Sequence, residues 1–170
     1  MDIEMEKIYL TGMMGCGKSA IGRKLASKLE RKFVDLDALI EQREGKRITD
    51  IFEEGGEALF RRIETEVLTE VSRRKEALVV SCGGGIVLKD ENVDIMRRTG
   101  RVVLIRRSVE NIIGTLDTKK RPLLKNDAEN VEKIYGQRKE RYEVTSHVQI
   151  SNNAGMEEAV EKIIRALETI

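Results

Sequence analysis

Three glycines, a lysine and a serine lie close together in the segment TGMMGCGKSAIGRKL, which spans residues 11–25. Side chains that could fill a core are almost absent from it before Ile21. Glycines at Gly12, Gly15 and Gly17 allow the backbone to turn so that successive N–H groups point inward, an arrangement that suits the oxygen atoms of a phosphate. The segment is therefore predicted to fold around an anion.

The eight residues Gly12–Ser19 fit the pattern G-x-x-x-x-G-K-[S/T] of a phosphate-binding P-loop. Lys18 is expected to reach the β- and γ-phosphates of ATP, the Ser19 hydroxyl to bind Mg²⁺, and the following helix to add the positive end of its dipole. The backbone at Cys16 and Ala20 belongs to the same nucleotide site, while the Cys16 thiol is assigned no chemistry. An exposed lysine in a plain glycine-rich turn is the competing interpretation.

Two predicted helices carry charged residues inside their apolar faces. Glu64 falls within an apolar arc of the helix Glu57–Arg74, and Arg61 is its expected partner because a lone carboxylate there would be costly. Arg138 lies in the middle of the apolar face of Asp127–Val144. Each arginine could snorkel or join a structural ion pair. Two inward arginines with one evident inward carboxylate favour a bound carboxylate or phosphate, because paired guanidinium groups suit such anions.

Acidic residues straddle the end of a predicted strand, Phe33–Leu36. Strand alternation would put Asp35 and Asp37 on one side, near the P-loop if the strands are neighbours. Asp35 could then hold Mg²⁺ through water, and Asp37 could accept the proton of a substrate hydroxyl. The alternative is a helix N-cap, a role that Asp37 could also fill.

Three glycines, Gly83, Gly84 and Gly85, follow another predicted strand, Leu78–Cys82. Consecutive glycines are entropically expensive, and they make sense where the backbone must closely approach a ligand. A simple turn would also explain them. We treat this segment as a candidate part of the substrate site.

One stretch resembles a long surface loop: residues 114–127, GTLDTKKRPLLKND, which contain the only proline of the chain, Pro122. Its basic residues Lys119, Lys120 and Arg121 could be a solvated charge run. In a P-loop protein a basic mobile loop also commonly covers the phosphates and excludes water. This loop is therefore predicted to be a lid.

Strand candidates alternate with helical stretches along the chain. The expected strands are Ile8–Gly12, Phe33–Leu36, Leu78–Cys82, Val102–Ile105 and His147–Ile150. The expected helices are Lys18–Leu29, Asp37–Glu44, Glu57–Arg74, Glu91–Thr99, Ser108–Ile113, Asp127–Val144 and Met156–Glu168. This alternation predicts a parallel sheet with helices on both faces, whose carboxyl edge is where open α/β sheets bind ligands.

Composition argues against some partners and locations. The chain of 170 residues has 31 lysines and arginines against 30 aspartates and glutamates, so a net charge of +1 gives no overall field to attract nucleic acid or an anionic membrane. Its acidic first residues show no signal-peptide pattern, and no apolar run approaches a membrane span. Cys16 and Cys82 fit a reduced protein better than a disulfide scaffold. We expect one cytoplasmic domain over residues 1–170.

The P-loop, DLD, FRRIE, GGG, RPLL and RKERY occur in an order and spacing that resemble the shikimate kinases, from about Ile8 to His147. The resemblance implies transfer of the ATP γ-phosphoryl group to the 3-hydroxyl of shikimate, with Mg²⁺, on the route to chorismate and the aromatic amino acids. It further implies a three-layer α-β-α fold with a five-stranded parallel sheet of order 2-3-1-4-5. We also expect a monomer. The lid would cover residues 114–127, and a substrate-binding helical region residues 37–64.

The resemblance also implies roles for single residues. Asp37 would contact the shikimate hydroxyls as the candidate base, and Arg61 and Arg138 would clamp the carboxylate, with Glu64 orienting Arg61. The other implied contacts are the substrate lining at Gly83, Gly84 and Gly85, the lid arginine Arg121 on the transferred phosphate, and Asp35 and Ser81 in the outer shell of the metal. Family members often stack the adenine between two arginines that NIIGTLD and SNNAG lack, and Asn152 or Asn153 could substitute.

Two other classes of function compete with this interpretation. One is a P-loop kinase of another small molecule, such as gluconate or a nucleotide. The paired inward arginines and the glycine run favour a small carboxylated polyol over a nucleotide acceptor. The other is a non-catalytic nucleotide-binding switch, which would have no need of a second anion site.

Overall fold

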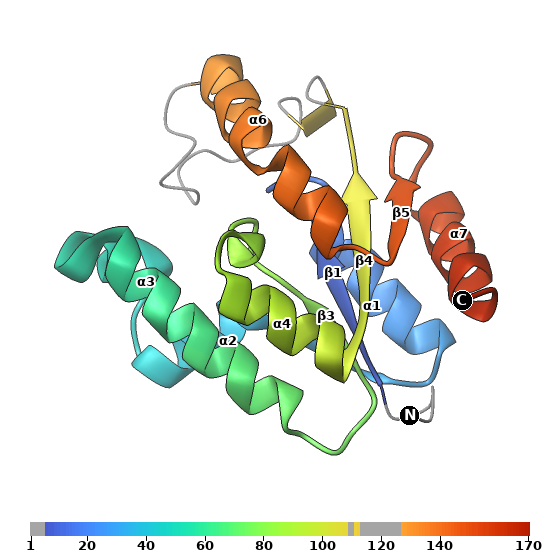
Figure 1. The fold of residues 1–170 in the computed structure, drawn as a ribbon, viewed down its shortest axis with the longest axis horizontal. Coiled ribbons are helices and arrows are strands. Elements are labelled where there is room, and N and C mark those ends of the chain that lie inside the picture. Colours follow the sequence, from blue (N-terminus) through green and yellow to red (C-terminus); the bar gives the residue numbers. More distant parts are fainter. Residues whose placement is uncertain (1–5, 109–110, 113–126) are drawn as a thin grey trace.

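A five-stranded parallel sheet runs through the centre of the computed structural model, which describes residues 6–108, 111–112 and 127–170 (Figure 1). The strands are β1 (Lys7–Thr11), β2 (Lys32–Asp35), β3 (Leu78–Ser81), β4 (Gly100–Arg106) and β5 (Val148–Ser151). They lie in the order β2-β3-β1-β4-β5, and all four neighbouring pairs are parallel. This order confirms the predicted one.

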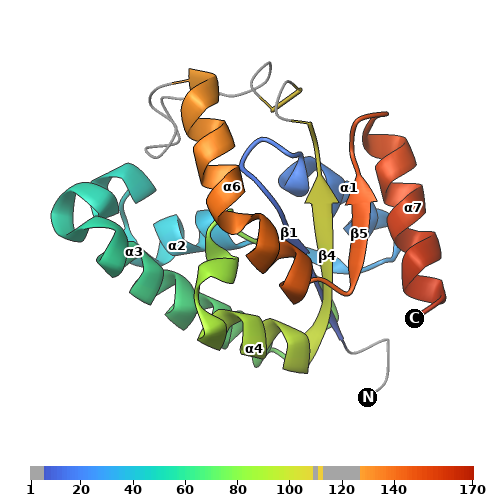
Figure 2. The same ribbon diagram turned by 45° about the horizontal axis from the view of Figure 1, so that its top comes forward.

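Helices cover both faces of the sheet (Figures 1 and 2). The helices are α1 (Lys18–Lys28), α2 (Leu36–Glu44), α3 (Ile48–Ser72), α4 (Asp90–Thr99), α6 (Asp127–Thr145) and α7 (Met156–Glu168), with a short 3₁₀ turn, η2 (Ile86–Leu88). On one face α1 and α7 lie side by side, and α3, α4 and α6 occupy the other. The expected three-layer arrangement is therefore present.

Alternation along the strands divides the core into two layers. In β1, Ile8 and Leu10 pack with α1 and α7, whereas Tyr9 between them packs into the layer under α3, α4 and α6. All three side chains are buried, because a parallel sheet with helices on both faces leaves neither face to water. The core therefore lies in two layers, one between the sheet and each group of helices.

Helix α3 begins at Ile48, nine residues before the predicted start at Glu57. Gly56 interrupts its helical geometry, with φ 70° and ψ −167°, so that a first helical segment and the predicted one meet at a kink. The adjacent glycines Gly55 and Gly56 resemble a loop in the sequence, so the helical segment before them was not predicted. The predicted start at Glu57 therefore matches the segment after the kink, and the helical segment before Gly56 was missed.

Two predicted elements lie partly or wholly outside the described residues. Of the expected helix Ser108–Ile113, Asn111 and Ile112 are helical in the structure. Apart from Asp127, the first residue of α6, the proposed lid at residues 114–127 falls outside the described residues, and so does Arg121. Among the helices that the structure does describe, none combines the length and the apolar character needed to cross a membrane.

The junction of α4 and β4 offers a test of this packing. Gly100→Ala should lower the free energy of unfolding by about 1–3 kcal/mol through overpacking, because the added Cβ would lie 2.0 Å from the carbonyl oxygen of Lys7. Gly136→Ala is the matched control, since its Cβ meets nothing within 4 Å in the exposed part of α6. The control should raise the free energy of unfolding by roughly 0.5–1 kcal/mol. Urea unfolding measures both, and equal effects of the two changes would contradict the described junction.

Candidate active site

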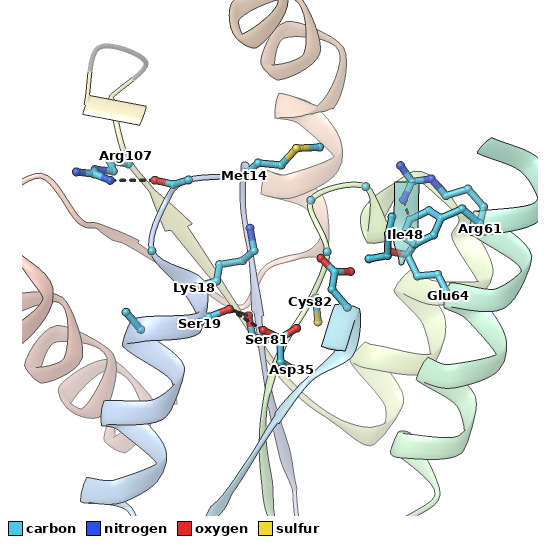
Figure 3. A pocket seen from close by; sticks show the side chains of 18 of the residues that line it. Met14, Lys18, Ser19, Asp35, Ile48, Arg61, Glu64, Ser81, Cys82 and Arg107 are labelled. Atoms are coloured by element: carbon cyan, nitrogen blue, oxygen red, sulfur yellow. Dashed lines mark hydrogen bonds and ion pairs between the residues drawn. The ribbon is translucent and has the colours of Figure 1, made fainter. Parts of the chain in front are cut away.

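A cavity of about 450 Å³ opens at the carboxyl edge of the sheet. Residues that follow β1, β2, β3 and β4 line it, together with one side of α3. Figure 3 shows Lys18 and Ser19 on one side of this cavity and Arg61 with Glu64 on the other. Most of the predicted site residues that the structure describes line this cavity, whereas Gly12, Cys16 and Arg138 lie outside its lining, and the roles of all of them remain predictions.

The loop between β1 and α1 has the backbone geometry that its glycines predict. Gly12, Gly15 and Gly17 have φ values of 138°, 79° and 97°, which side chains rarely allow. Space imposes a second requirement, because a Cβ at Gly12 would lie 2.4 Å from the carbonyl oxygen of Ile105. Alanine at Gly12 would therefore be both strained and obstructed.

Lys18 lies at the centre of this loop. Its ammonium donates hydrogen bonds to the carbonyl oxygens of Gly12, at 2.7 Å, and Met13, at 2.9 Å. The side chain is buried, and these two acceptors are neutral backbone groups of the loop itself. A phosphate oxygen would offer a stronger, charge-assisted acceptor at this place.

Three side-chain oxygens meet below the loop. The Ser19 hydroxyl donates to Asp35 Oδ2 at 2.9 Å and lies 3.3 Å from the Ser81 hydroxyl. Oxygen atoms are the ligands that Mg²⁺ prefers, usually a few from the protein with water and phosphate supplying the rest. No group of three or more histidine, cysteine, aspartate or glutamate side chains within the described residues could form an all-protein metal cage. Ser19 and Asp35 thus fit Mg²⁺ of the kind that accompanies a nucleotide.

The two aspartates of DLD occupy different elements. Asp35 ends β2 and also caps α2, where its Oδ1 accepts a hydrogen bond from the backbone N–H of Ala38 at 3.2 Å. Asp37 lies in the first turn of α2. The two aspartates therefore do not lie on one side of a strand, as strand alternation predicted. The helix N-cap is Asp35 and not Asp37. Both still line the cavity, because the helix begins directly at the end of the strand.

Arg61 and Glu64 form the buried pair that the helical arc predicts. Arg61 Nη1 donates to Glu64 Oε1 at 3.0 Å, and the two side chains are 9% and 1% exposed. The other edge of the guanidinium, Nε and Nη2, donates to Glu57 Oε1 at 3.3 and 3.2 Å. Glu57 is half exposed, so its charge is better screened than that of Glu64.

The carboxyl group of Glu64 is perturbed by this environment. Burial raises the pKa of Glu64 to about 7, and the neighbouring Arg61 charge offsets only part of that rise. Its second oxygen, Oε2, is buried and has no hydrogen-bond partner among the described residues. This acid therefore changes its charge near neutral pH.

Arg138 reaches the same region from α6. The side chain is 4% exposed, and its Nη1 has no hydrogen-bond partner in the described part of the chain. Buried guanidinium groups normally have their donors satisfied, so an unsatisfied one marks a place for an acceptor. The prediction that Arg138 is buried within the apolar face formed by Val131 and Tyr142 is confirmed.

The glycine run makes room for these charges. A Cβ at Gly85 would lie 2.2 Å from Arg61 Nη2, and one at Gly84 would lie 3.3 Å from Arg138 Nη1. A Cβ at Gly83 would come within 2.9 Å of Glu64 Oε2 and 3.0 Å of Asp37 Oδ1. The backbone was expected to approach a ligand closely. The structure adds that the charged side chains of the cavity occupy the space that side chains at these positions would need.

Arg107 is a cavity residue that the sequence analysis missed. It follows β4, lines the cavity, and donates through Nη1 to the carbonyl oxygen of Gly15 at 2.9 Å (Figure 3). Its position after the predicted strand Val102–Ile105 was the available signal, since each neighbouring strand end had already supplied a candidate. An apolar wall of Ile48, Phe52 and Phe60 was missed as well.

The two asparagines after β5 hold neighbouring loops. Asn152 Nδ2 donates to the carbonyl oxygen of Cys16 at 2.9 Å, so this side chain supports the P-loop. Asn153 Oδ1 accepts from the backbone N–H of Ser108 at 2.9 Å. Their suggested part in binding adenine remains a prediction. The cavity itself brings together the following predicted site residues: Gly15, Gly17, Lys18, Ser19, Ala20, Asp35, Asp37, Arg61, Glu64, Gly83, Gly84 and Gly85.

Known proteins resemble the chain in sequence and in structure. Residues 14–168 match the family model described as shikimate kinase. A shikimate kinase of Clostridium botulinum (strain Eklund 17B / Type B) is 41% identical over 157 residues, which are 92% of this chain and 94% of the relative.

Solved structures agree with the sequence match. A shikimate kinase from Acinetobacter baumannii in complex with shikimate has a TM-score of 0.93 and 35% identity, covering 98% of this chain and 95% of that one. A gluconokinase from Sinorhizobium meliloti reaches a TM-score of 0.63 at 19% identity, over 99% of this chain and 94% of that one, and shares the fold alone. Because the family model spans nearly the whole chain, this protein belongs to the shikimate kinase family.

Proposed function

We propose that this chain transfers the γ-phosphoryl group of ATP to the 3-hydroxyl of shikimate, giving shikimate 3-phosphate and ADP in the pathway to chorismate and the aromatic amino acids. One observation carries the proposal: the cavity sets the P-loop lysine opposite the buried Arg61, and Arg138, buried beside Gly84 at the same edge, has a donor without a hydrogen-bond partner among the described residues. A triphosphate and a carboxylated acceptor fit these two halves.

The P-loop half holds the nucleotide. Backbone N–H groups of the loop from Gly12 to Ala20 surround the β-phosphate, and the Lys18 ammonium moves from its carbonyl acceptors to the β- and γ-phosphate oxygens. Charge on the transferred group is then neutralised as the transition state forms. Arg121 is proposed to act on the same phosphate from the lid.

The opposite half holds the acid. Arg61 and Arg138 bind the carboxylate of shikimate, and Gly83, Gly84 and Gly85 let the ring approach the backbone. Asp37 accepts a hydrogen bond from the 3-hydroxyl and takes its proton as the new bond to phosphorus forms. Glu64 keeps Arg61 in place through the bond to Nη1. Positioning of both reactants is the main source of rate in such a transfer.

Ser19 and Asp35, the latter through water, are the proposed holders of Mg²⁺. When bound, the ion would neutralise charge on the β- and γ-phosphates. The residues proposed to bind shikimate lie on other elements than Ser19 and Asp35, since Arg61 comes from α3 and Arg138 from α6.

The remaining expectations are also proposals. A monomer is sufficient, because residues of one chain supply both halves of the cavity. A cytoplasmic location accords with the use of ATP and with two free, buried cysteines, Cys16 and Cys82. The near balance of basic and acidic residues, 31 against 30, gives no general attraction to nucleic acid or membranes.

Lys18→Ala should lower kcat by at least about a hundredfold, because a charge that stabilises the transferred phosphoryl group is removed. Lys24→Ala is the matched control: this lysine lies on the same helix but pairs with Glu157 outside the cavity. A coupled assay of ADP release measures both variants, and urea unfolding verifies that both are folded. Near-normal turnover in folded Lys18→Ala protein would contradict the assigned phosphate contact.

Arg61→Ala and Arg138→Ala should each weaken shikimate binding on the order of ten- to a hundredfold, since a charge-assisted hydrogen bond is worth roughly 1.5–3 kcal/mol. ATP affinity should change little. Calorimetric titration measures both ligands, with the exposed neighbour Arg62 changed to alanine as the control. Lysine at either position should restore binding only in part, because it lacks the planar fork.

An uncharged amide analogue of shikimate completes this test. The wild-type enzyme should prefer the acid to the amide, and the double alanine variant should lose most of that preference. Retention of the full preference would place the carboxylate site elsewhere.

A further inference from the structure

Glu64 is the most deeply buried carboxylate of the cavity, and its two oxygens have different environments. Oε1 accepts the hydrogen bond from Arg61, whereas Oε2 is buried and has no hydrogen-bond partner among the described residues. Oε2 and Asp37 Oδ1 both lie about 3 Å from the Cβ position of Gly83, at 2.9 and 3.0 Å. Two carboxylate oxygens thus converge on one point beside the glycine run.

The charges that face Glu64 come from every element around it. Arg61 lies on α3 with it, Asp37 on α2 and Arg138 on α6, while the neutral Cys82 thiol follows β3. Lys18 lines the same cavity from the P-loop. Two guanidinium groups therefore face the carboxylates of Glu64 and Asp37, and the half-exposed Glu57 pairs with the outer edge of Arg61. Lys18 is reserved for the phosphates under the proposed function.

Binding an anionic acid upsets this balance. The carboxylate of shikimate, which the proposed function assigns to Arg61 and Arg138, would add a further negative charge to a cluster in which carboxylates already outnumber the two guanidinium groups. In a site shielded from water, an excess carboxylate charge is costly, and a nearby proton acceptor relieves it. Arg61 is also already engaged at Nη1 by Glu64 and at Nε and Nη2 by Glu57.

We propose that Glu64 takes up a proton when shikimate binds, so that Arg61 exchanges its ion pair with Glu64 for one with the carboxylate of the substrate. The proton comes from solvent, adds to a carboxylate oxygen of Glu64, and returns to solvent when the phosphorylated product leaves. Glu64 is a positioning residue in this account, since it acts on the substrate through Arg61. The proposal rests on the proposed function, because it needs an anionic acid beside Arg61.

Glu64 is better suited to this exchange than Asp37. Burial already raises the pKa of Glu64 to about 7, so one further negative charge favours protonation near neutral pH. Asp37 is only partly buried, and under the proposed function it must stay ionised to accept the hydroxyl proton. At pH 6, about one unit below this pKa, Glu64 is mostly protonated before shikimate binds, so proton uptake should be small. At pH 8, about one unit above it, Glu64 is mostly ionised before binding, so proton uptake should be larger.

Calorimetry of shikimate binding in buffers of different ionisation enthalpy measures this uptake directly. The full-length wild-type enzyme, without nucleotide, should take up most of one proton per site near pH 8 and almost none near pH 6. Its shikimate dissociation constant should rise by up to about tenfold per pH unit above neutrality. Glu64→Gln should bind shikimate with no proton uptake and with an affinity that is nearly independent of pH. Glu57→Gln, which removes the half-exposed partner of Arg61, should retain the uptake.

Two outcomes would overturn the proposal: wild-type enzyme that binds shikimate without proton uptake, or uptake that persists in Glu64→Gln. If that variant fails to fold or bind, infrared difference spectra of wild-type enzyme near pH 8 decide the matter. Adding shikimate should produce the C=O band of a protonated carboxylic acid, and its absence would contradict the exchange. Failure of shikimate to bind or to be phosphorylated would instead refute the proposed function, so the two failures are distinct.

Discussion

Residues 83–85 carry no side chains, and the charged groups of the acceptor half of the cavity occupy the space that side chains there would fill. Arg61, Arg138 and the carboxylates of Glu64 and Asp37 all come within 2.2–3.3 Å of the missing Cβ positions. Four charged groups from three helices can meet beside this backbone segment only because its three residues have no side chains. Buried ion pairs contribute little net stability, so a cluster of this kind is better explained by the ligand that it binds.

Glycine serves two different physical purposes on the two sides of the cavity. In the P-loop, Gly15 and Gly17 adopt positive φ values of 79° and 97°, which turn the N–H groups toward a phosphate. In the acceptor half, Gly85 has an ordinary φ of −98°, and its value lies in the absence of a Cβ. One side therefore depends on backbone conformation and the other on space. The sheet joins them, since both segments follow strands that end at the same edge.

Features that depend on residue type and spacing within one segment were predicted from the sequence. The P-loop motif, the helical arc that contains Glu64 and the buried position of Arg138 required only spacing and residue type, and the sheet order came from the family resemblance. Features that depend on tertiary contacts were missed or misread. The helical segment before the kink at Gly56 was missed, and it packs into the core through Ile51, which is 1% exposed. Arg107 follows a predicted strand, but its contact with the P-loop depends on the place of β4 in the sheet, which its local sequence does not give. The proposed lid, apart from Asp127, lies outside the described part of the chain.

The central claim, that missing side chains at the glycine run position the charges of the acceptor half, is tested most directly by measuring shikimate and ATP affinities of Gly83→Ala, Gly84→Ala and Gly85→Ala. The atoms that these methyl groups would meet first are mainly ends of flexible side chains, so the variants should fold. Each should bind shikimate more weakly while ATP affinity changes little. Gly85→Ala should have the largest effect, because its Cβ would displace the Arg61 guanidinium, and Gly84→Ala the smallest. Folded variants that bind shikimate as tightly as the wild-type protein would contradict the account.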